Sequence, residues 1–135
     1  MFMKTLLHAI KIKTDPERVW HALTDITEMA AWHEGTVQGA IAEGESLILN
    51  PKDDLHFVWE TEQLVSPSLI VQICTEGPGH SVGKRLQFTL SPLSDGRTLV
   101  ELADGQWEDN DPHLPLCNTY WGAVLYRLKV YIEQH

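Results

Sequence analysis

The 135-residue sequence has only two cysteines and no long apolar run. Cys74 and Cys117 could form at most one disulfide, and a chain of this length builds a core without one, so we interpret both as buried free thiols. Lys4, His8 and Lys11 interrupt the apolar N-terminal residues, so we expect neither a signal peptide nor a membrane span. Together these features predict a reducing, cytoplasmic setting.

Basic residues are also scarce: 10 lysines and arginines stand against 19 acidic residues, for a formal net charge of -9. Such a charge repels nucleic-acid phosphates and anionic lipid surfaces. We therefore expect neither nucleic acid nor a membrane as a partner. The charge favours a neutral or cationic partner instead.

Motifs that would identify an enzyme or a metal protein are missing as well. Residues 77–85 superficially resemble a phosphate-binding loop, but Pro78 replaces the first required glycine and Arg85 replaces the Ser or Thr. His33 and Glu34 are not followed by the second histidine of a zinc-protease motif, and no Gly-x-Ser-x-Gly motif occurs. The sequence therefore predicts no metal and no cofactor, and it identifies no catalytic residue.

Periodicity divides the chain into a strand, two short helices, a run of strands and a final helix. Residues 5–13 alternate as a half-buried strand does, and His8 falls on the apolar face. Asp15 and Pro16 then supply an N-cap carboxylate and a proline at the first helical position, which is a strong helix start. A second short helix follows to about Trp32, and residues 35–104 are predicted to form strands and turns.

Alternation within the strands predicts which side chains face inward. In residues 55–65 the charged residues share one parity, so Phe57 and Trp59 should face the interior. The same counting predicts that Gln72 points outward and that the last strand ends near Ala103. The other residues predicted to face inward are Leu69, Val71, Ile73, Leu86, Phe88, Leu90, Val100 and Leu102. No acidic residue is placed inward by this parity.

The last predicted element is a helix over residues 116–133. Its apolar residues recur at three- and four-residue intervals: Cys117, Trp121, Val124, Leu125, Leu128 and Ile132. Such a stripe needs a large apolar surface to cover it, and the inward faces of the strands provide one. We predict an α+β fold in one domain over residues 1–135, in which a curved antiparallel sheet of about six or seven strands wraps around this helix.

Three segments carry a resemblance to a known superfamily. TDPERVWHALTD (residues 14–25) followed by Trp32, GRTLVEL (residues 96–102) and WGAVLYRLKVYIE (residues 121–133) resemble its N-terminal signature, last strand and closing helix. The superfamily is the START-like (SRPBCC, helix-grip) one, and the branch is that of homologues of the activator of the heat-shock-ninety ATPase. One departure follows the last strand. Members often continue with a Thr-His-Ser-Gly type segment, whereas residues 102–107 read LADGQW, with an acid or a glycine in place of that histidine.

The resemblance implies a cavity between sheet and helix that holds a hydrophobic or aromatic small molecule or a lipid. Relatives include lipid carriers, hormone receptors, polyketide cyclases and co-chaperones, and the shared fold does not choose among them. We predict a non-catalytic binding domain, present as a monomer or homodimer. A polyketide cyclase or dehydratase-like enzyme, which would use His8 with a carboxylate, and a co-chaperone-type interaction module stay open as alternatives.

Eight residues are predicted to bind the ligand: His8, Trp32, Phe57, Trp59, Phe88, Trp107, Trp121 and Leu125. The aromatic rings would line the cavity, unless they simply fill the core. His8 or the Trp107 indole would orient the ligand, although the pattern at His8 favours a hydrogen-bonded core histidine over a ligand contact.

Overall fold

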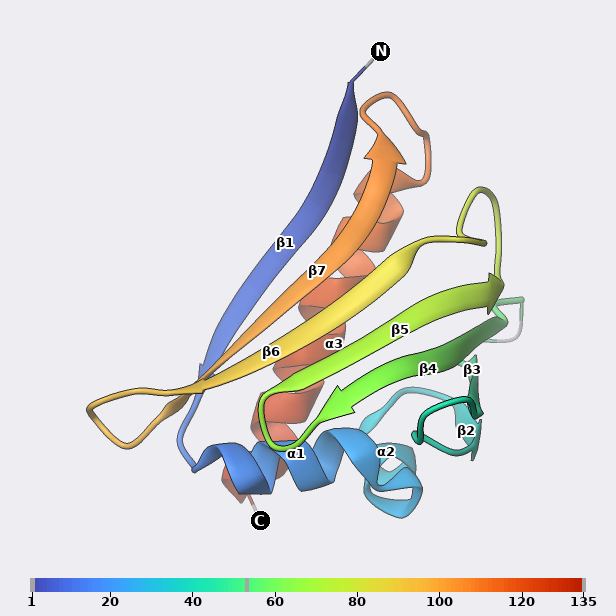
Figure 1. Ribbon diagram of the computed structural model, residues 1–135. Helices are drawn as coiled ribbons and strands as arrows, with labels where there is room; N and C mark the ends of the chain where they lie inside the picture. Colours follow the sequence, from blue (N-terminus) through green and yellow to red (C-terminus); the bar gives the residue numbers. More distant parts are fainter. Residues whose placement is uncertain (1, 53, 135) are drawn as a thin grey trace.

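A seven-stranded antiparallel sheet in the order β1-β7-β6-β5-β4-β3-β2 dominates the computed structural model, which describes residues 2–52 and 54–134 (Figure 1). The strands are β1 (Met3–Ile12), β2 (Thr36–Gly39), β3 (Ser46–Asn50), β4 (Phe57–Val65), β5 (Leu69–Glu76), β6 (Arg85–Pro92) and β7 (Thr98–Glu108). The helices are α1 (Pro16–Thr24), α2 (Ile26–Trp32) and α3 (Leu114–Gln134). The predicted order of elements is confirmed.

Two aspartates set the bounds of the short helices. The Asp15 side chain accepts a hydrogen bond of 2.9 Å from the backbone N–H of Arg18 and so caps α1. Asp25 ends α1 and caps α2 in the same way, through the backbone N–H of Glu28 at 3.0 Å. The helix start predicted at residues 15 and 16 is therefore confirmed.

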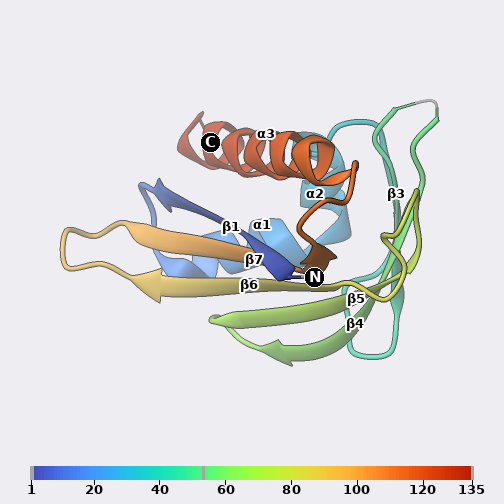
Figure 2. The same cartoon turned by 90° about the horizontal axis from the view of Figure 1, so that it is seen from above.

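Helix α3 lies across the concave face of the sheet. Figure 2 shows it over β1 and β7, with the strands at the β3 end curving up beside its N-terminal half. The predicted stripe is buried at Trp121, Val124, Leu125, Leu128 and Ile132 and is half-buried at Cys117. This is the helix-grip arrangement that the sequence predicted. No helix in the described part of the chain is both long enough and apolar enough to cross a membrane.

Strand β5 presents the face opposite to the predicted one. Gln72 is buried, and its amide Nε2 donates to Oγ1 of Thr61, 3.3 Å away, on the neighbouring strand. Ile70 pairs with the core residue Phe88, so the inward set contains Ile70, Gln72 and Cys74. The prediction that residues 69, 71 and 73 point inward is wrong. Residues 69–71 are apolar on both parities, so alternation there gave no reliable direction.

Strand β7 runs further than predicted, to Glu108 rather than Ala103. Its polar end is held on both sides, because Trp107 pairs with Lys4 of β1 and Gly105 pairs with Arg85 of β6. Continuing the alternation of residues 100 and 102 turns Asp104 toward the interior, where it is only 2% exposed. The expectation that no acidic residue faces inward is therefore wrong.

Candidate functional site

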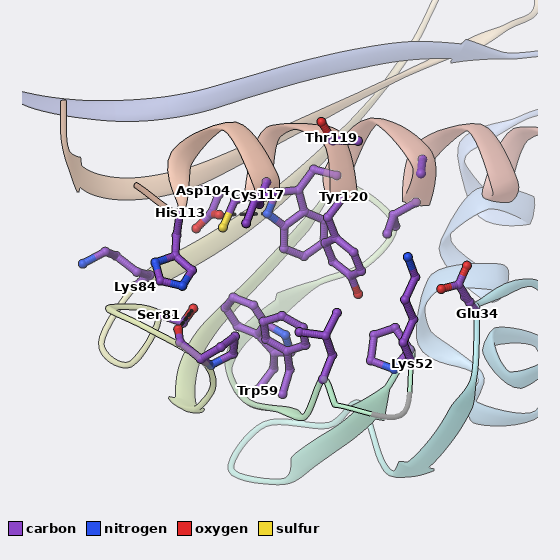
Figure 3. A pocket seen from close by; sticks show the side chains of 18 of the residues that line it. Glu34, Lys52, Trp59, Ser81, Lys84, Asp104, His113, Cys117, Thr119 and Tyr120 are labelled. Carbon is purple, nitrogen blue, oxygen red and sulfur yellow. Dashed lines mark hydrogen bonds between the residues drawn. The ribbon is translucent and has the colours of Figure 1, made fainter. Parts of the chain in front are cut away.

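A cavity of about 460 Å³ lies between α3 and the curved end of the sheet (Figure 3). Its wall draws on the segment after α2, the β3–β4 connection, β4, the β5–β6 loop, the end of β7 and the N-terminal half of α3. Small-molecule sites in proteins are typically concave hollows of about 300–1,000 Å³, so the volume is in the range that holds a ligand.

Aromatic rings form much of this wall. Trp59 and Trp121 have ring centroids 6.0 Å apart, and Tyr120 meets Trp121 edge to face at 5.0 Å. Phe57 stacks on Tyr120 at 5.6 Å with an interplanar angle of 25°. These contacts fix the rings against one another and leave the enclosed space beside them. Trp107, which is 1% exposed, completes the wall from β7.

The structure thus brings together four of the eight predicted ligand residues on this wall: Phe57, Trp59, Trp107 and Trp121. The other four lie away from it. Trp32 is held in the core, where its indole N–H donates to the backbone oxygen of Ala22 at 2.9 Å, and Phe88 and Leu125 also pack in the core. His8 faces α3, because a Cβ added to Gly122 would lie 3.9 Å from its Cε1 atom.

Asp104 is the buried acid of the cavity. Its Oδ2 atom accepts a hydrogen bond of 2.8 Å from the indole N–H of Trp121. Burial raises the pKa of the Asp104 carboxyl, and the N–H groups of Trp121 and Trp107 with the charges of Lys84 and His8 oppose part of this effect. Its second oxygen, Oδ1, is buried and has no hydrogen-bond partner among the described residues. The acid therefore offers one unused oxygen.

Other polar groups near Asp104 are a lysine and a thiol. The Lys84 ammonium lies 4.9 Å from the centroid of the Trp107 ring, in a cation–π contact at the cavity wall. Burial, reinforced by the charge of Asp104, raises the pKa of the Cys117 thiol to about 11. Cys117 is therefore protonated at neutral pH and is not a ready nucleophile.

The opposite part of the wall carries a neutral hydrogen-bond pair. The Nδ1–H of His33 donates to the backbone oxygen of Glu34 at 2.8 Å, so Nε2 accepts from the Tyr120 hydroxyl at 3.0 Å. Burial lowers the pKa of His33 and raises that of Tyr120, so both stay uncharged at neutral pH. At the rim, Arg127 binds Glu34 at 2.9 Å.

Two loops meet at the cavity beside His113. The Nδ1 atom of His80, in the β5–β6 loop, donates to Asp111 Oδ2 at 2.9 Å. Asp111 Oδ1 accepts the backbone N–H of His113 at 2.8 Å. The Asp111 carboxylate thus ties the β5–β6 loop to the segment that leads into α3.

The sequence reasoning missed Asp104, Tyr120 and His33. Tyr120 follows Cys117 by three residues and precedes Val124 by four, so the helical spacing could have identified it. Asp104 continues the parity of β7, but the predicted strand ended near Ala103, so this alternation was not extended to residue 104. Nothing in the sequence pattern indicates that His33, which follows a short helix, reaches Tyr120.

The described residues 2–52 and 54–134 contain no group of three or more His, Cys, Asp or Glu side chains that could hold a metal ion. His8 makes no hydrogen bond to a carboxylate there, and its Nε2 atom is buried without a partner. The arrangement described for a His8-dependent enzyme is therefore not formed.

Solved structures share this fold over nearly the whole chain. The Aha1 dimer from Colwellia psychrerythraea has a TM-score of 0.88 at 22% identity, with 97% of each chain covered. DynU16, from the dynemicin biosynthetic locus, has a TM-score of 0.83 at 18% identity; the match covers 96% of this chain and 47% of DynU16. CalU16 from Micromonospora echinospora has a TM-score of 0.79 at 18% identity, covering 96% of this chain and 76% of CalU16.

The family comparison is more specific than these fold similarities. No curated protein matches the sequence. The family described as "Activator of Hsp90 ATPase homolog 1-like protein" matches residues 13–133, which extend from just before α1 to the penultimate residue of α3. This chain therefore belongs to the family of activator of Hsp90 ATPase homolog 1-like proteins, within the START-like (SRPBCC) helix-grip fold.

Proposed function

We propose that this chain binds a hydrophobic or aromatic small molecule in the cavity between α3 and the sheet. The observation that carries the proposal is that Phe57, Trp59, Trp107 and Trp121 border a space of about 460 Å³. If these rings only filled the core, no such space would remain beside them. An apolar hollow with a few placed polar groups is the usual composition of a small-molecule site.

The shape of the wall favours a flat ring system over a lipid chain. Tyr120 and Trp121 meet edge to face, and Phe57 stacks on Tyr120, so the wall presents both ring faces and ring edges. Stacked and edge contacts between aromatic rings contribute about 0.5–1.5 kcal/mol beyond the area they bury. A planar ligand gains this contribution, whereas an acyl chain gains only burial.

Naphthalene is a suitable first probe because it is neutral, flat and has no polar group. In ¹H–¹⁵N spectra we expect it to shift the indole N–H signals of Trp59, Trp107 and Trp121. The signal of Trp32 should stay in place, since that indole is bonded to Ala22 in the core. Unchanged spectra at saturating naphthalene, or an equal shift of Trp32, would contradict the proposal. Native mass spectrometry of freshly purified protein would add the mass of any retained natural ligand.

A second candidate function is catalysis of the cyclase or dehydratase kind, and the observation that favours it is Asp104. A buried carboxyl with a raised pKa, inside an apolar cavity, can donate its proton to a leaving hydroxyl group, and the carboxylate that results can accept the α-proton, so that water leaves and the acid is restored. DynU16, which shares the fold, comes from a biosynthetic locus. A β-hydroxyketone whose loss of water is followed by absorbance tests this. Turnover that Asp104→Asn abolishes while naphthalene still binds would support it; no rate above that of buffer would oppose it.

A homodimer in the cytoplasm is the assembly and location that we propose alongside this function. The Colwellia protein was solved as a dimer, and its fold similarity covers 97% of this chain. Light scattering coupled to size-exclusion chromatography would distinguish a dimer from a monomer.

A further inference from the structure

Buried polar atoms without a partner collect around the cavity. Among the described residues, the buried side-chain atoms that lack a hydrogen bond are His8 Nε2, Asp104 Oδ1, Trp107 Nε1 and His113 Nδ1. Three of these four residues line the cavity. Leaving such an atom unsatisfied costs about 1–3 kcal/mol, and folded proteins rarely do so. The unpaired atoms of Asp104 and Trp107 therefore need an explanation.

We infer that the ligand of this cavity carries an uncharged hydroxyl group, which donates to Asp104 Oδ1 and accepts from the indole N–H of Trp107. The inference rests on the proposed binding function and adds the chemical class of the ligand. Asp104 is 2% exposed and Trp107 is 1% exposed, so bulk water does not compete freely for either group. A ligand that reaches both groups recovers two hydrogen bonds that the protein alone leaves unmade.

The donor and acceptor pattern selects the hydroxyl group. Asp104 Oδ1 requires a donor when the carboxyl is ionised, and the Trp107 indole N–H can only donate. An ammonium offers donors alone and a carboxylate offers acceptors alone, whereas a hydroxyl offers both on one oxygen atom. The two protein groups are neighbours: the Trp107 N–H lies close enough to lower the pKa of Asp104, but it is not aligned to form a hydrogen bond with Oδ1.

Charge excludes the ionised alternatives. The Lys84 ammonium already lies over the Trp107 ring at 4.9 Å and would repel a cationic ligand group placed beside that ring. An anionic group would lose its hydration in a water-poor environment, whether or not Asp104 is ionised. An uncharged polar group avoids both penalties.

The position of Asp104 and Trp107 in the cavity also sets the orientation of the ligand. Figure 3 shows Asp104 and Cys117 with His113 and Lys84 toward one end of the cavity, and Glu34 and Lys52 toward the other. Trp59 and Tyr120 lie between these ends. The hydroxyl group therefore points to the Asp104 end, and the ring system lies over the aromatic wall.

Four probes with one ring system test the inference: naphthalene, 1-naphthol, 1-naphthylmethylammonium and 1-naphthoate. We expect 1-naphthol to bind about tenfold more tightly than naphthalene, as one to two recovered hydrogen bonds would give. The two ions should bind more weakly than naphthalene. Fluorescence titration gives the four dissociation constants, and the Trp107 indole proton signal should lie further downfield with 1-naphthol bound than with naphthalene bound.

Three variants distinguish the contribution of these hydrogen bonds to ligand affinity from the contribution of the shape of the aromatic wall. Trp107→Phe removes the indole N–H and Asp104→Leu removes the carboxyl, so each should reduce the preference for 1-naphthol over naphthalene to about threefold or less. Trp59→Phe is the matched control: it should weaken both probes by the same factor and keep the preference. Circular dichroism and a thermal melt establish that each variant is folded.

The outcomes distinguish this inference from the proposed function. Equal binding of naphthalene and 1-naphthol, or tighter binding of either ion, overturns the hydroxyl assignment and leaves the binding function standing. A preference that persists in both Trp107→Phe and Asp104→Leu also overturns it. If none of the four probes binds the wild-type protein, the binding function itself fails.

Discussion

The indole N–H of Trp121 donates a 2.8 Å hydrogen bond to Oδ2 of Asp104, which joins the N-terminal half of α3 to the second half of β7. Both side chains are buried, at 4% and 2% exposure. The bond therefore serves the fold and the candidate site together. It holds the helix against the sheet, and it fixes the carboxyl so that one oxygen is hydrogen-bonded while the other is buried without a partner among the described residues.

Removing the donor of this bond should destabilise the protein. In Trp121→Phe both oxygens of the Asp104 carboxyl would be buried without a strong donor, so we expect the free energy of unfolding to fall by about 1–3 kcal/mol beyond the loss of ring area. Urea denaturation measures this change. Trp59→Phe is the control for ring area, because it shortens a neighbouring indole that makes contact with Trp121.

The double variant Trp121→Phe with Asp104→Leu completes a double-mutant cycle, which measures the energy of the interaction between the two side chains. If the Trp121→Phe loss arises from the stranded carboxyl, it should shrink to the value of the Trp59→Phe control once that carboxyl is gone. Additive losses in the double variant would show that the bond contributes nothing to stability.

The ionisation of buried Asp104 should make the protein less stable as the pH rises from its ordinary pKa of 3.8 through its raised pKa in the folded state. Burial raises the pKa of this carboxyl in the folded state, so the folded protein holds the proton at pH values where the unfolded chain has lost it. The stabilisation is complete below the ordinary pKa of 3.8 and is lost as the pH rises through the raised value. Asp104→Asn keeps an acceptor for Trp121 but does not titrate.

Urea denaturation of the wild type and of Asp104→Asn over this pH range gives the test. The free energy of unfolding of the variant, relative to the wild type, should increase with pH. A difference that is constant with pH, or that grows toward acid, would show that the pKa of Asp104 is not raised.

The sequence predicts those parts of the fold and the site that depend on residues close together in the chain. The cap at Asp15 and the stripe from Trp121 to Ile132 follow from residues close in sequence, and both are confirmed. Asp104 was missed because its strand is extended by pairing with β1, whose residues lie about a hundred positions earlier. Gln72 was misplaced because its partner, Thr61, belongs to another strand and cannot be identified from alternation alone.

The tryptophans illustrate the same limit. Trp59 and Trp32 are both buried aromatic residues near the predicted interior, but Trp59 lines the cavity while Trp32 donates to Ala22 in the core. Strand parity fixes the direction of the first. The direction of the second depends on how α1 and α2 pack together, and no residue spacing encodes that angle.

Filling the cavity from α3 should abolish ligand binding with little cost in stability. Val124 and Leu125 are both buried in the core, but only Val124 also lines the cavity. The ring in Val124→Phe would enter empty space, so we expect naphthalene affinity to fall at least about tenfold while stability changes by less than about 1 kcal/mol. Leu125→Phe overpacks the core and should cost about 1–3 kcal/mol.

Fluorescence titration and urea denaturation of these two variants test where the empty space lies. Val124→Ala is the control for the loss of the native side chain, and it should still bind naphthalene. A large loss of stability in Val124→Phe would mean that the wall is already packed there.

The tie between the loops at the cavity should respond to pH in the direction opposite to Asp104. The backbone N–H of His113 and then the His80 side chain hold the pKa of Asp111 below its ordinary value. A lowered pKa stabilises the fold above the ordinary value of the group, and this stabilisation is lost as the pH falls through the lowered one. Asp111→Asn should therefore have a lower free energy of unfolding than the wild type at neutral pH. The difference between the two free energies should become smaller as the pH falls.

Hydrogen exchange can show at which residues the substitution of Asp111 loosens the structure. In Asp111→Asn the backbone N–H of His113 keeps an amide oxygen as acceptor but loses the charged one, so exchange should accelerate at residue 113 and in the β5–β6 loop. His80→Gln removes only the loop contact and should accelerate exchange in that loop while leaving residue 113 protected. If His80→Gln loosens both segments equally, the two loops open as one unit, and Asp111 does not anchor residue 113 independently of His80.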